Sequence, residues 1–378
     1  MLKVGITGQS GFVGTHLYNT LGLLSDKFMR IPFDDKFFNE REKLIEFVTS
    51  CDVIVHLAAM NRHNDPEVLY STNISLVKKL IEACDSSNIT PHILFSSSTQ
   101  EERDNLYGRS KKEGRELFEN WAKRSGARFT GLVIPNVFGP FGNPYYNSVV
   151  ATFCHQLTHK ETPTIETDGE LKLIYVAELV DFLLNKIEVT VLNDVESIER
   201  CEVPYTSTIK VSELLEKLKG FKERYFENGM LPNLGNALDR NLFNTLLTYN
   251  DHKSFFPFHL KLNTDERGSF VETIKLNSGG QVSFSTTKPG ITRGNHFHTR
   301  KAERFAVIKG KAIIEFRRIG TDKKFTFELD GGNNPSFVDM PVWFTHNITN
   351  VGTEEVYTIF WISEHFDPAD QDTFFEQV

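Results

Sequence analysis

The feature that most constrains the fold is the stretch of residues 1–14, where a short apolar segment runs into a glycine-rich turn. Alternating apolar side chains over residues 2–6 predict a buried strand, and apolar positions over residues 13–24 predict a helix. In such a unit the first glycine permits a tight turn, the second lets the backbone approach a pyrophosphate, and the third lets the helix pack closely. The N–H groups at the helix start then face the phosphates. The residues assigned to this predicted dinucleotide site are Gly8, Gly11, Phe12, Val13 and Gly14.

Strands and helices alternate through the first part of the chain. Further strands are expected over residues 28–33, 52–59 and 92–95, and helices over residues 41–50 and 73–84. Alternation of this kind produces a parallel sheet with helices on both faces. We therefore predict an α/β Rossmann-type parallel sheet domain.

Two further segments are expected to touch the dinucleotide. Leu57, Ala58 and Ala59 end a buried strand, and their small side chains would let the dinucleotide lie against the backbone. At the end of the second strand, an acidic residue commonly binds the ribose of NAD, whereas an arginine can bind the 2′-phosphate of NADP. Arg30 and Asp34 are both present, so the residues alone leave the choice between NAD and NADP open.

A tyrosine and a lysine lie on one face of a predicted helix. Tyr107 and Lys111 are four residues apart, and the preceding strand ends in serines, among them Ser96 and Ser98. A lysine ammonium beside a phenol favours the phenolate and lowers its pKa, which makes the tyrosine a usable acid and base near neutrality. A serine hydroxyl at the strand end can hold a substrate oxygen. The pattern predicts acid–base chemistry next to the dinucleotide.

Composition excludes some classes of partner. The chain of 378 residues carries a formal net charge of -8 without a lysine–arginine cluster, which argues against nucleic-acid binding. The four cysteines are scattered and form no Cys-x-x-Cys pair, as expected of reduced thiols in a cytoplasmic protein. We expect no signal peptide before the first strand and no membrane insertion, because no apolar run is long enough to cross a bilayer.

Over residues 1–245 the chain resembles an extended short-chain dehydrogenase/reductase of the nucleotide-sugar type. The matching motifs are Thr7-Gly8-x-x-Gly11-x-x-Gly14, His56-Leu57-Ala58-Ala59, Ser96-Ser97-Ser98, Tyr107-x-x-x-Lys111 and Pro135-Asn136-Val137-Phe138-Gly139-Pro140. The resemblance implies that Ser98, Tyr107 and Lys111 form the catalytic group. It also implies contacts with the cofactor from Ser96, Tyr107, Lys111 and Pro135. Asn73 is placed with them in the cofactor region, and the resemblance implies that it supports the active-site helix.

The sequence departs from that family in two places. Only eight residues separate Ser98 from Tyr107, where the family has a longer loop, so the substrate pocket is expected to be shorter on that side. Sugar dehydratases of the family carry Asp-Glu directly after the serine or threonine, and here Thr99 and Gln100 occupy those places. Neither side chain is a strong acid or base, whereas hydride transfer needs only the tyrosine, the lysine and the reduced cofactor. We therefore expect a reductase.

From Phe255 onward the pattern changes to short strands separated by Gly, Pro and Asn turns, which predicts an all-β sandwich or barrel. We place the boundary near residue 252, giving a reductase domain at 1–252 and a second domain at 253–378. Four residues of the second domain are candidate metal ligands: His296, His298, Glu303 and His346. Alternate residues of a strand share a face, and three imidazoles with a carboxylate suit a borderline transition metal.

This stretch resembles the two motifs of the cupins, which implies an all-β cupin barrel. Zinc is our first choice of metal, with iron, manganese or nickel as alternatives. Residues 265–270 and 293–297 resemble metal-free cupin epimerases of keto-deoxysugar nucleotides, in which the residue matching His296 is the base. A metal-bound imidazole nitrogen cannot also take a proton. With the other three ligands present we favour the metal, and the base at C3 is then unassigned.

Over its whole length the chain resembles bifunctional enzymes of capsular polysaccharide synthesis. The resemblance implies that the cupin domain inverts C3 of a UDP-2-acetamido-2,6-dideoxy-4-hexulose. The reductase domain then reduces C4 with NADPH to UDP-N-acetyl-6-deoxytalosamine, on the route to UDP-N-acetyl-L-fucosamine. Epimerisation comes first, because the C4 ketone makes the C3 proton acidic. A homodimer is also implied. The alternative is a single-activity reductase whose cupin is a binding or dimerising module.

Overall fold

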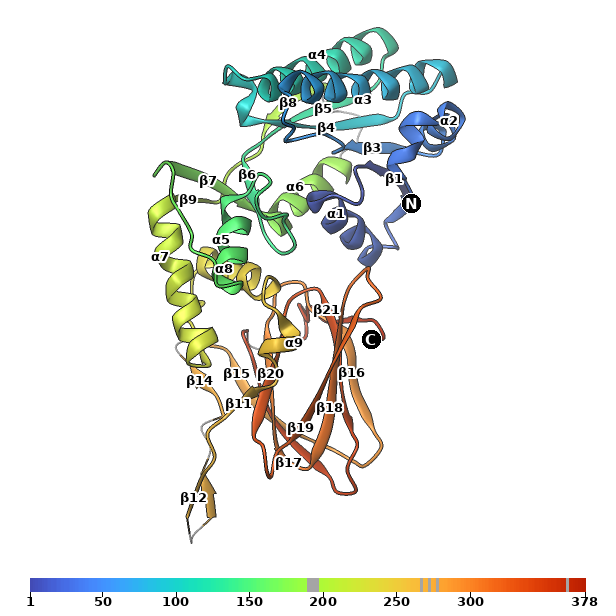
Figure 1. Cartoon of the computed structure of the whole chain (residues 1–378). Helices are drawn as coiled ribbons and strands as arrows, with labels where there is room; N and C mark the ends of the chain where they lie inside the picture. Colours follow the sequence, from blue (N-terminus) through green and yellow to red (C-terminus); the bar gives the residue numbers. More distant parts are fainter. Residues whose placement is uncertain (189–196, 266–267, 271–272, 277–278, 365–366) are drawn as a thin grey trace. The chain divides into compact units, whose positions relative to one another are not determined.

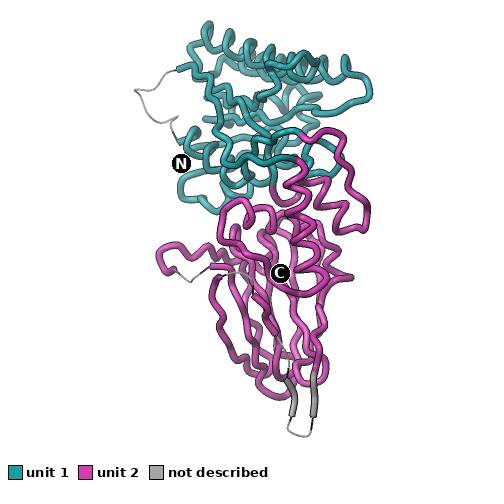
Figure 2. The backbone as a smooth tube through the Cα atoms, turned by 90° about the vertical axis from the view of Figure 1, so that its left-hand side faces the viewer, with its two compact units in different colours: residues 1–138, 142–149, 169–210 teal, residues 139–141, 150–168, 211–378 magenta. Residues whose placement is uncertain are grey.

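The computed structural model describes residues 1–188, 197–265, 268–270, 273–276, 279–364 and 367–378 (Figure 1). The chain forms two compact units (Figure 2). Unit 1 comprises residues 1–138, 142–149 and 169–210, and unit 2 comprises residues 139–141, 150–168 and 211–378. Residues 211–252, which the sequence analysis places in the first domain, therefore pack within unit 2, and the functional boundary near 252 stays a prediction.

Unit 1 is built on a six-stranded sheet in the order β2-β1-β3-β4-β5-β8, and every neighbouring pair is parallel. Its strands are β1 (Leu2–Thr7), β2 (Phe28–Ile31), β3 (Val53–His56), β4 (His92–Ser98), β5 (Phe129–Ile134) and β8 (Ile198–Glu202). Its helices are α1 (Phe12–Leu23), η1 (Asp35–Asn39), α2 (Arg41–Thr49), α3 (Pro66–Ser87), η2 (Thr99–Glu102), α4 (Leu106–Ser125) and α6 (Val176–Glu188). A second, three-stranded sheet contains β6 (Asn136–Phe138), β7 (Glu170–Tyr175) and β9 (Ser207–Lys210).

Helices cover both faces of the six-stranded sheet because successive strand residues point to opposite sides. Ile93 of β4 packs in a core with α2, α3 and α4, whereas the next residue, Leu94, packs in a core with α1 and α6. Figure 1 shows α3 and α4 on the side of the sheet opposite α1. The strand order reverses at β1, so the crevice for a ligand is expected at the carboxyl ends of β1 and β3. The predicted Rossmann-type architecture is confirmed.

Unit 2 contains two five-stranded antiparallel sheets, β11-β20-β17-β22-β15 and β19-β18-β21-β16-β23. Its strands are β10 (Met230–Leu231), β11 (Phe258–His259), β12 (Asn263–Asp265), β13 (Gly268–Phe270), β14 (Lys275–Leu276), β15 (Gln281–Thr287), β16 (Thr292–Phe297), β17 (Glu303–Lys309), β18 (Lys311–Arg318), β19 (Lys324–Asp330), β20 (Ser336–Met340), β21 (Phe344–Asn350), β22 (Val356–Ile362) and β23 (Phe374–Phe375). Its helices are α5 (Val149–Thr158), α7 (Val211–Phe221), the π-helical η4 (Lys222–Glu227), α8 (Ala237–Thr248) and α9 (His252–Phe255).

The two sheets enclose an aromatic core that includes Phe316, Phe327 and Phe337, each at most 5% exposed. This arrangement confirms the prediction of an all-β, cupin-like domain. Within the epimerase-like motif at 265–270, Glu266 and Arg267 lie outside the described residues.

Three buried histidines lead to a prediction about acid stability. Burial lowers the pKa of His56 and of His92 to about 3, and that of His252 to about 4. Each folded-state value lies below the unfolded value, so the unfolded chain binds more protons as the pH falls. The free energy of unfolding should therefore decrease below about pH 6.5, by up to about 1.4 kcal/mol per pH unit for each histidine. Urea unfolding at a series of pH values measures this slope.

His252 provides the variant for that experiment. Neither of its ring nitrogens has a hydrogen-bond partner among the described residues. The ring packs against aromatic neighbours: Phe256, Phe316, Phe325 and Phe344. Replacing His252 by phenylalanine keeps an aromatic ring but removes the titrating group. The variant should lose less stability than the wild type between about pH 6.5 and pH 4, and equal slopes would contradict the assignment.

Candidate active site and candidate metal centre

The glycine turn of unit 1 has the close backbone approaches that its sequence predicts. Gly8 has a φ of +72°, and a Cβ atom there would lie 2.8 Å from the amide nitrogen of Ala58. A Cβ atom at Gly14 would lie 2.2 Å from the carbonyl oxygen of Gly8. A side chain at either position would displace backbone, so the turn between β1 and α1 requires glycine at both.

A cavity of about 1310 Å³ opens beside this turn. Thirteen of the predicted site residues line it: Gly8, Gly11, Phe12, Val13, Gly14, Leu57, Ala58, Ala59, Ser96, Ser98, Tyr107, Lys111 and Pro135. The structure thus gathers the turn, the ends of β3 and β4 and the start of α4 around one space. Its volume and position are those expected of a dinucleotide site with room for a second ligand.

The two predicted cofactor-selecting residues do not line the cavity. The guanidinium of Arg30 lies 4.4 Å from the ring centre of Tyr18 and donates to the Tyr18 carbonyl. The carboxylate of Asp34 accepts a hydrogen bond from the Lys36 amide at the start of η1. Lys79 does line the cavity, and its ammonium donates to the side chain of Asn39. The ribose contacts predicted for Arg30 and Asp34 therefore stay predictions.

Asn73 is buried behind the cavity instead of lining it. Its side chain accepts a hydrogen bond from the Met60 amide and donates to the Met60 carbonyl, at 2.7 and 3.0 Å. It also donates to the hydroxyl of Ser110 on α4, at 3.0 Å. These contacts join the segment after β3 to α4, the arrangement expected of a residue that supports the helix carrying Tyr107.

Ser98, Tyr107 and Lys111 meet at the carboxyl end of β4. Tyr107 lies in the first turn of α4 and is hydrogen-bonded to the side chain of Ser98. The Lys111 ammonium lies 5.8 Å from the ring centre of Tyr107 and donates to the carbonyl of Ser96 at 2.9 Å. The structure thus brings together the three residues that the sequence analysis assigns to acid–base chemistry.

The protonation state of Tyr107 differs from the sequence expectation. Burial raises its pKa to about 12, although the hydrogen bond with Ser98 acts in the opposite direction. Burial also lowers the pKa of Lys111 to about 8, while the charge of Glu101 opposes that change. The sequence predicts that Lys111 lowers the pKa of the tyrosine, but the burial of the phenol is not visible in the sequence. Tyr107 is therefore protonated near neutral pH in this structure.

Two residues of the site were not predicted from the sequence, because their contacts form only in the fold. Glu101, in the short segment between Ser98 and Tyr107, forms a buried ion pair with Arg115 of α4 at 3.0 Å and accepts a hydrogen bond from Ser97. This pair fixes the shortened loop against α4. Tyr146 lines the cavity close enough to Tyr107 to raise its pKa, and its hydroxyl accepts a hydrogen bond from the Asn61 amide. No spacing motif marks either residue.

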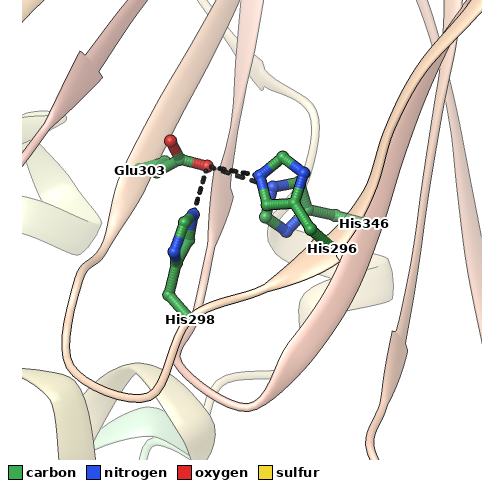
Figure 3. A group of neighbouring side chains, drawn as sticks. All are labelled: His296, His298, Glu303 and His346. Carbon is green, nitrogen blue, oxygen red and sulfur yellow. Dashed lines mark ion pairs between the residues drawn. The ribbon is translucent and has the colours of Figure 1, made fainter. Parts of the chain in front are cut away.

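Unit 2 brings the four predicted metal ligands together (Figure 3). His296 lies on β16, His298 directly follows that strand, Glu303 begins β17 and His346 lies on β21. The Glu303 Oε2 atom lies 3.9, 3.2 and 3.0 Å from the Nε2 atoms of His296, His298 and His346, respectively. All four candidate ligand atoms lie within 4.8 Å of one another. The spacing in the sequence predicted these ligands, but they come from three strands or the residues next to them. Only the fold therefore brings them together.

The chemistry of this cluster fits a metal ion. The Nε2 atoms of His298 and His346 and the Oε2 atom of Glu303 are buried without a hydrogen-bond partner among the described residues. The Nδ1 atoms of the same two imidazoles face backbone carbonyls, those of Asp372 at 2.5 Å and Phe344 at 3.2 Å. A carbonyl only accepts, so Nδ1 carries the proton and Nε2 presents its lone pair to the cluster. Such donors suit zinc and neighbouring transition metals.

His296 differs from the other three ligands in its exposure. Its side chain is 25% exposed, whereas those of His298, Glu303 and His346 are at most 7% exposed. Burial and the nearby His346 lower the pKa of His296 to about 4, so its imidazole is neutral near pH 7. A neutral imidazole at an opening could bind a metal or accept a proton, and both roles considered for His296 remain compatible with this geometry.

Comparison with known proteins supports the resemblance seen in the sequence. Residues 4–192 match the NAD dependent epimerase/dehydratase family, and residues 263–374 match the polysaccharide biosynthesis C-terminal domain. The crystal structure of the capsular polysaccharide assembling protein CapF from Staphylococcus aureus is 34% identical, with a TM-score of 0.62 and complete coverage of both chains. The chain belongs to the CapF family.

A second relative aligns with almost the full length of this CapF family member. UDP-2-acetamido-2,6-beta-L-arabino-hexul-4-ose reductase from Pseudomonas aeruginosa is 34% identical over 99% of this chain and 98% of that protein. UDP-glucose 4-epimerase from Thermotoga maritima shares the fold over 66% of this chain, at 18% identity and a TM-score of 0.54. Among the described residues, no helix combines the length and apolar character needed to span a membrane.

Proposed function

We propose that this chain is a bifunctional nucleotide-sugar enzyme of capsular polysaccharide precursor synthesis. Its cupin domain would epimerise C3 of UDP-2-acetamido-2,6-dideoxy-4-hexulose, and its reductase domain would reduce the C4 ketone with NADPH to UDP-N-acetyl-6-deoxytalosamine. The observation that carries the proposal is the meeting of Ser98, Tyr107 and Lys111 in the cavity beside the glycine turn. The name of the Pseudomonas aeruginosa relative, a reductase of a UDP-activated 4-ketosugar, supports the substrate class.

The residues of unit 1 perform the proton chemistry that ketone reduction needs. Bound NADPH supplies the hydride. The hydroxyl of Ser98 holds the ketone oxygen, and Tyr107, kept protonated by burial, donates its proton to that oxygen as it gains negative charge. Lys111 is fixed by the Ser96 carbonyl, and its charge stabilises the phenolate that remains. Thr99 and Gln100 supply no acid or base for loss of water.

In unit 2, four residues would hold a zinc ion: His296, His298, Glu303 and His346. Zinc would supply Lewis-acid stabilisation of the oxygen of the substrate enolate. The protein's own contribution is a buried, preorganised donor set with one edge open at His296. The alternative role of His296 as the base at C3 excludes metal binding through the same nitrogen. We favour the metal because three further ligands converge on one point.

Three accompanying proposals follow from the same resemblance. The chain acts as a homodimer, epimerisation precedes reduction, and the enzyme works in the cytoplasm. The four cysteines are free in the structure, which supports the last of these. A second candidate function is a single-activity 4-ketosugar reductase whose cupin-like unit is a binding or dimerising module. The name of the Pseudomonas aeruginosa relative favours this second function, since it describes a reductase alone.

The two functions differ in what happens at C3. We expect the wild type, incubated with NADPH and the UDP-activated 4-keto-6-deoxy amino sugar in deuterated water, to oxidise NADPH and to incorporate deuterium at C3. The His296→Ala variant should lose about 10²-fold or more of the deuterium incorporation, whether His296 is ligand or base. His259→Ala, at an exposed histidine of β11, is the matched control. Unchanged product stereochemistry in His296→Ala would favour the single-activity reductase.

A further inference from the structure

The C-terminal segment of the chain passes directly beside the candidate metal centre. Asp372 is only 6% exposed and has a φ of +40°, a conformation that few residues other than glycine adopt. Two residues further on, β23 pairs with β16, and Phe375 is the register partner of His296. The last residues therefore flank the strand that carries one ligand and approach the loop that carries another.

The carboxylate of Asp372 closes the loop between β16 and β17. Its Oδ1 atom accepts hydrogen bonds from the amide and the hydroxyl of Thr299, at 3.0 and 2.6 Å. Its Oδ2 atom accepts from the amides of Arg300 and Lys301, at 3.0 and 3.1 Å. Four donors on one buried carboxylate fix the path of three consecutive residues. Charge-assisted hydrogen bonds of this kind are stronger than neutral ones.

That loop runs between two candidate ligands. His298 precedes Thr299 directly, and Glu303 follows Lys301 after one residue. The carbonyl oxygen of Asp372 also accepts a hydrogen bond from the Nδ1 atom of His298, at 2.5 Å. One residue thus fixes the tautomer and direction of the His298 ring through its backbone, and the loop leading to Glu303 through its side chain. Lys301 adds a hydrogen bond from its ammonium to the Gln371 carbonyl.

We propose that Asp372 is a positioning residue of the metal centre, and that the C-terminal segment around it holds His298 and Glu303 in their metal-binding arrangement. The proposal rests on the proposed metal site. Partners of this kind around metal-bound imidazoles typically change metal affinity by about 10–100-fold when they are removed. By reciprocity, metal binding should in turn stabilise the C-terminal segment.

The first test compares zinc affinity in full-length variants. Asparagine at position 372 keeps the size of the side chain and tolerates the positive φ, but its amide group would face the two N–H donors of Arg300 and Lys301. Competition between metal-free protein and a chromophoric zinc chelator should show about 10–100-fold weaker binding for Asp372→Asn. Thr299→Val removes only the hydroxyl donor and should give a smaller loss in the same direction.

The matched control lies two residues away in the same segment. Asp370 is 63% exposed and pairs with the guanidinium of Arg300, so Asp370→Asn removes the same charge without touching the loop amides. Its zinc affinity should change by less than about fivefold, because an exposed ion pair contributes little. Equal affinities in Asp372→Asn and wild type would overturn the role of the Asp372 carboxylate, because the variant keeps the backbone carbonyl that faces His298. A wild type that binds no zinc would overturn the proposed metal site itself.

A second measurement uses the unmodified protein, so it stands even if Asp372→Asn fails to fold. Hydrogen exchange of the amides of Thr299, Arg300 and Lys301, and of residues 373–376, should slow when zinc is added to metal-free protein. Slower exchange in both segments is expected if metal and tail stabilise each other. Exchange in the C-terminal segment that does not respond to zinc binding would contradict the coupling.

Discussion

Replacement of Tyr107 by phenylalanine is expected to reduce the rate of NADPH oxidation by about 10²–10⁴-fold, the usual contribution of a general acid. The ring and its packing stay, and only the proton donor next to Ser98 is lost. Burial raises the pKa of this phenol still further above neutral pH, so the wild type has the proton available, whereas the variant has no hydroxyl. Single-turnover measurement of hydride transfer with the UDP-activated 4-ketosugar tests the prediction, and a titration of NADPH fluorescence shows whether binding is retained.

The same variant also tests whether the two activities are independent. Deuterium should still enter C3 in Tyr107→Phe, because that exchange needs the intact ketone and the residues of unit 2. Tyr205→Phe is the control, since Tyr205 is 48% exposed and does not line the cavity. Undiminished hydride transfer in Tyr107→Phe would rule out its role as acid. Loss of both activities would argue against separate sites.

Much of the candidate active site of unit 1 could be predicted because many of its residues are close together in the sequence. The turn at Gly8 and Gly14 is a local structure: Gly8 is required by its positive φ, and Gly14 by the approach of the Gly8 carbonyl. The further approach of Ala58 to Gly8 comes from the end of β3 and could not be predicted locally. Tyr107 and Lys111 share a helix face for the same local reason. Long-range contacts could not be read in this way. Glu101 and Arg115 meet only because η2 folds back on α4, and Tyr146 reaches Tyr107 from a segment without a motif.

The candidate metal centre of unit 2 likewise combines residues that could be predicted from the sequence with residues that could not. The His-x-His spacing and Glu303 marked the ligands, because alternate strand residues point the same way. No motif marked Asp372, which lies 74 residues from His298. Burial was also invisible. Burial raises the pKa of Tyr107, whereas the sequence predicted a lowered pKa. Residues 211–252 pack within unit 2, although their helical pattern continues that of the first domain.

Replacement of Asp339 by asparagine is expected to lower the free energy of unfolding of unit 2 by about 3–5 kcal/mol. Asp339 of β20 forms two hydrogen bonds with the guanidinium of Arg304 on β17, at 2.8 and 2.9 Å, and accepts one from the Tyr225 hydroxyl. Arg304 and Tyr225 are completely buried. The variant would leave the arginine charge without its counter-ion in an apolar environment. Urea unfolding followed by tryptophan fluorescence measures the loss.

The buried group of Tyr225, Arg304 and Asp339 also explains how η4 is held to the barrel. Arg304 donates to the carbonyl of Gly229 at 2.7 Å and stacks on Phe337, with its guanidinium carbon 3.5 Å from the ring centre. Tyr225→Phe removes only one hydroxyl and should destabilise by about 1–2 kcal/mol. Asp322→Asn, at an exposed position between β18 and β19, should change stability by less than about 0.5 kcal/mol.

A double replacement separates a buried ion pair from simple packing. Arg304→Met combined with Asp339→Leu removes both charges and fills the space with apolar side chains. If the penalty of Asp339→Asn arises from an uncompensated buried charge, the double variant should be more stable than the single variant, although it carries more changes. A double variant no more stable than Asp339→Asn would instead show that the pair contributes through packing and hydrogen bonds alone. Such a result would remove the electrostatic reason for an aspartate beneath β17, but not the contact that joins residues 225–229 to the barrel.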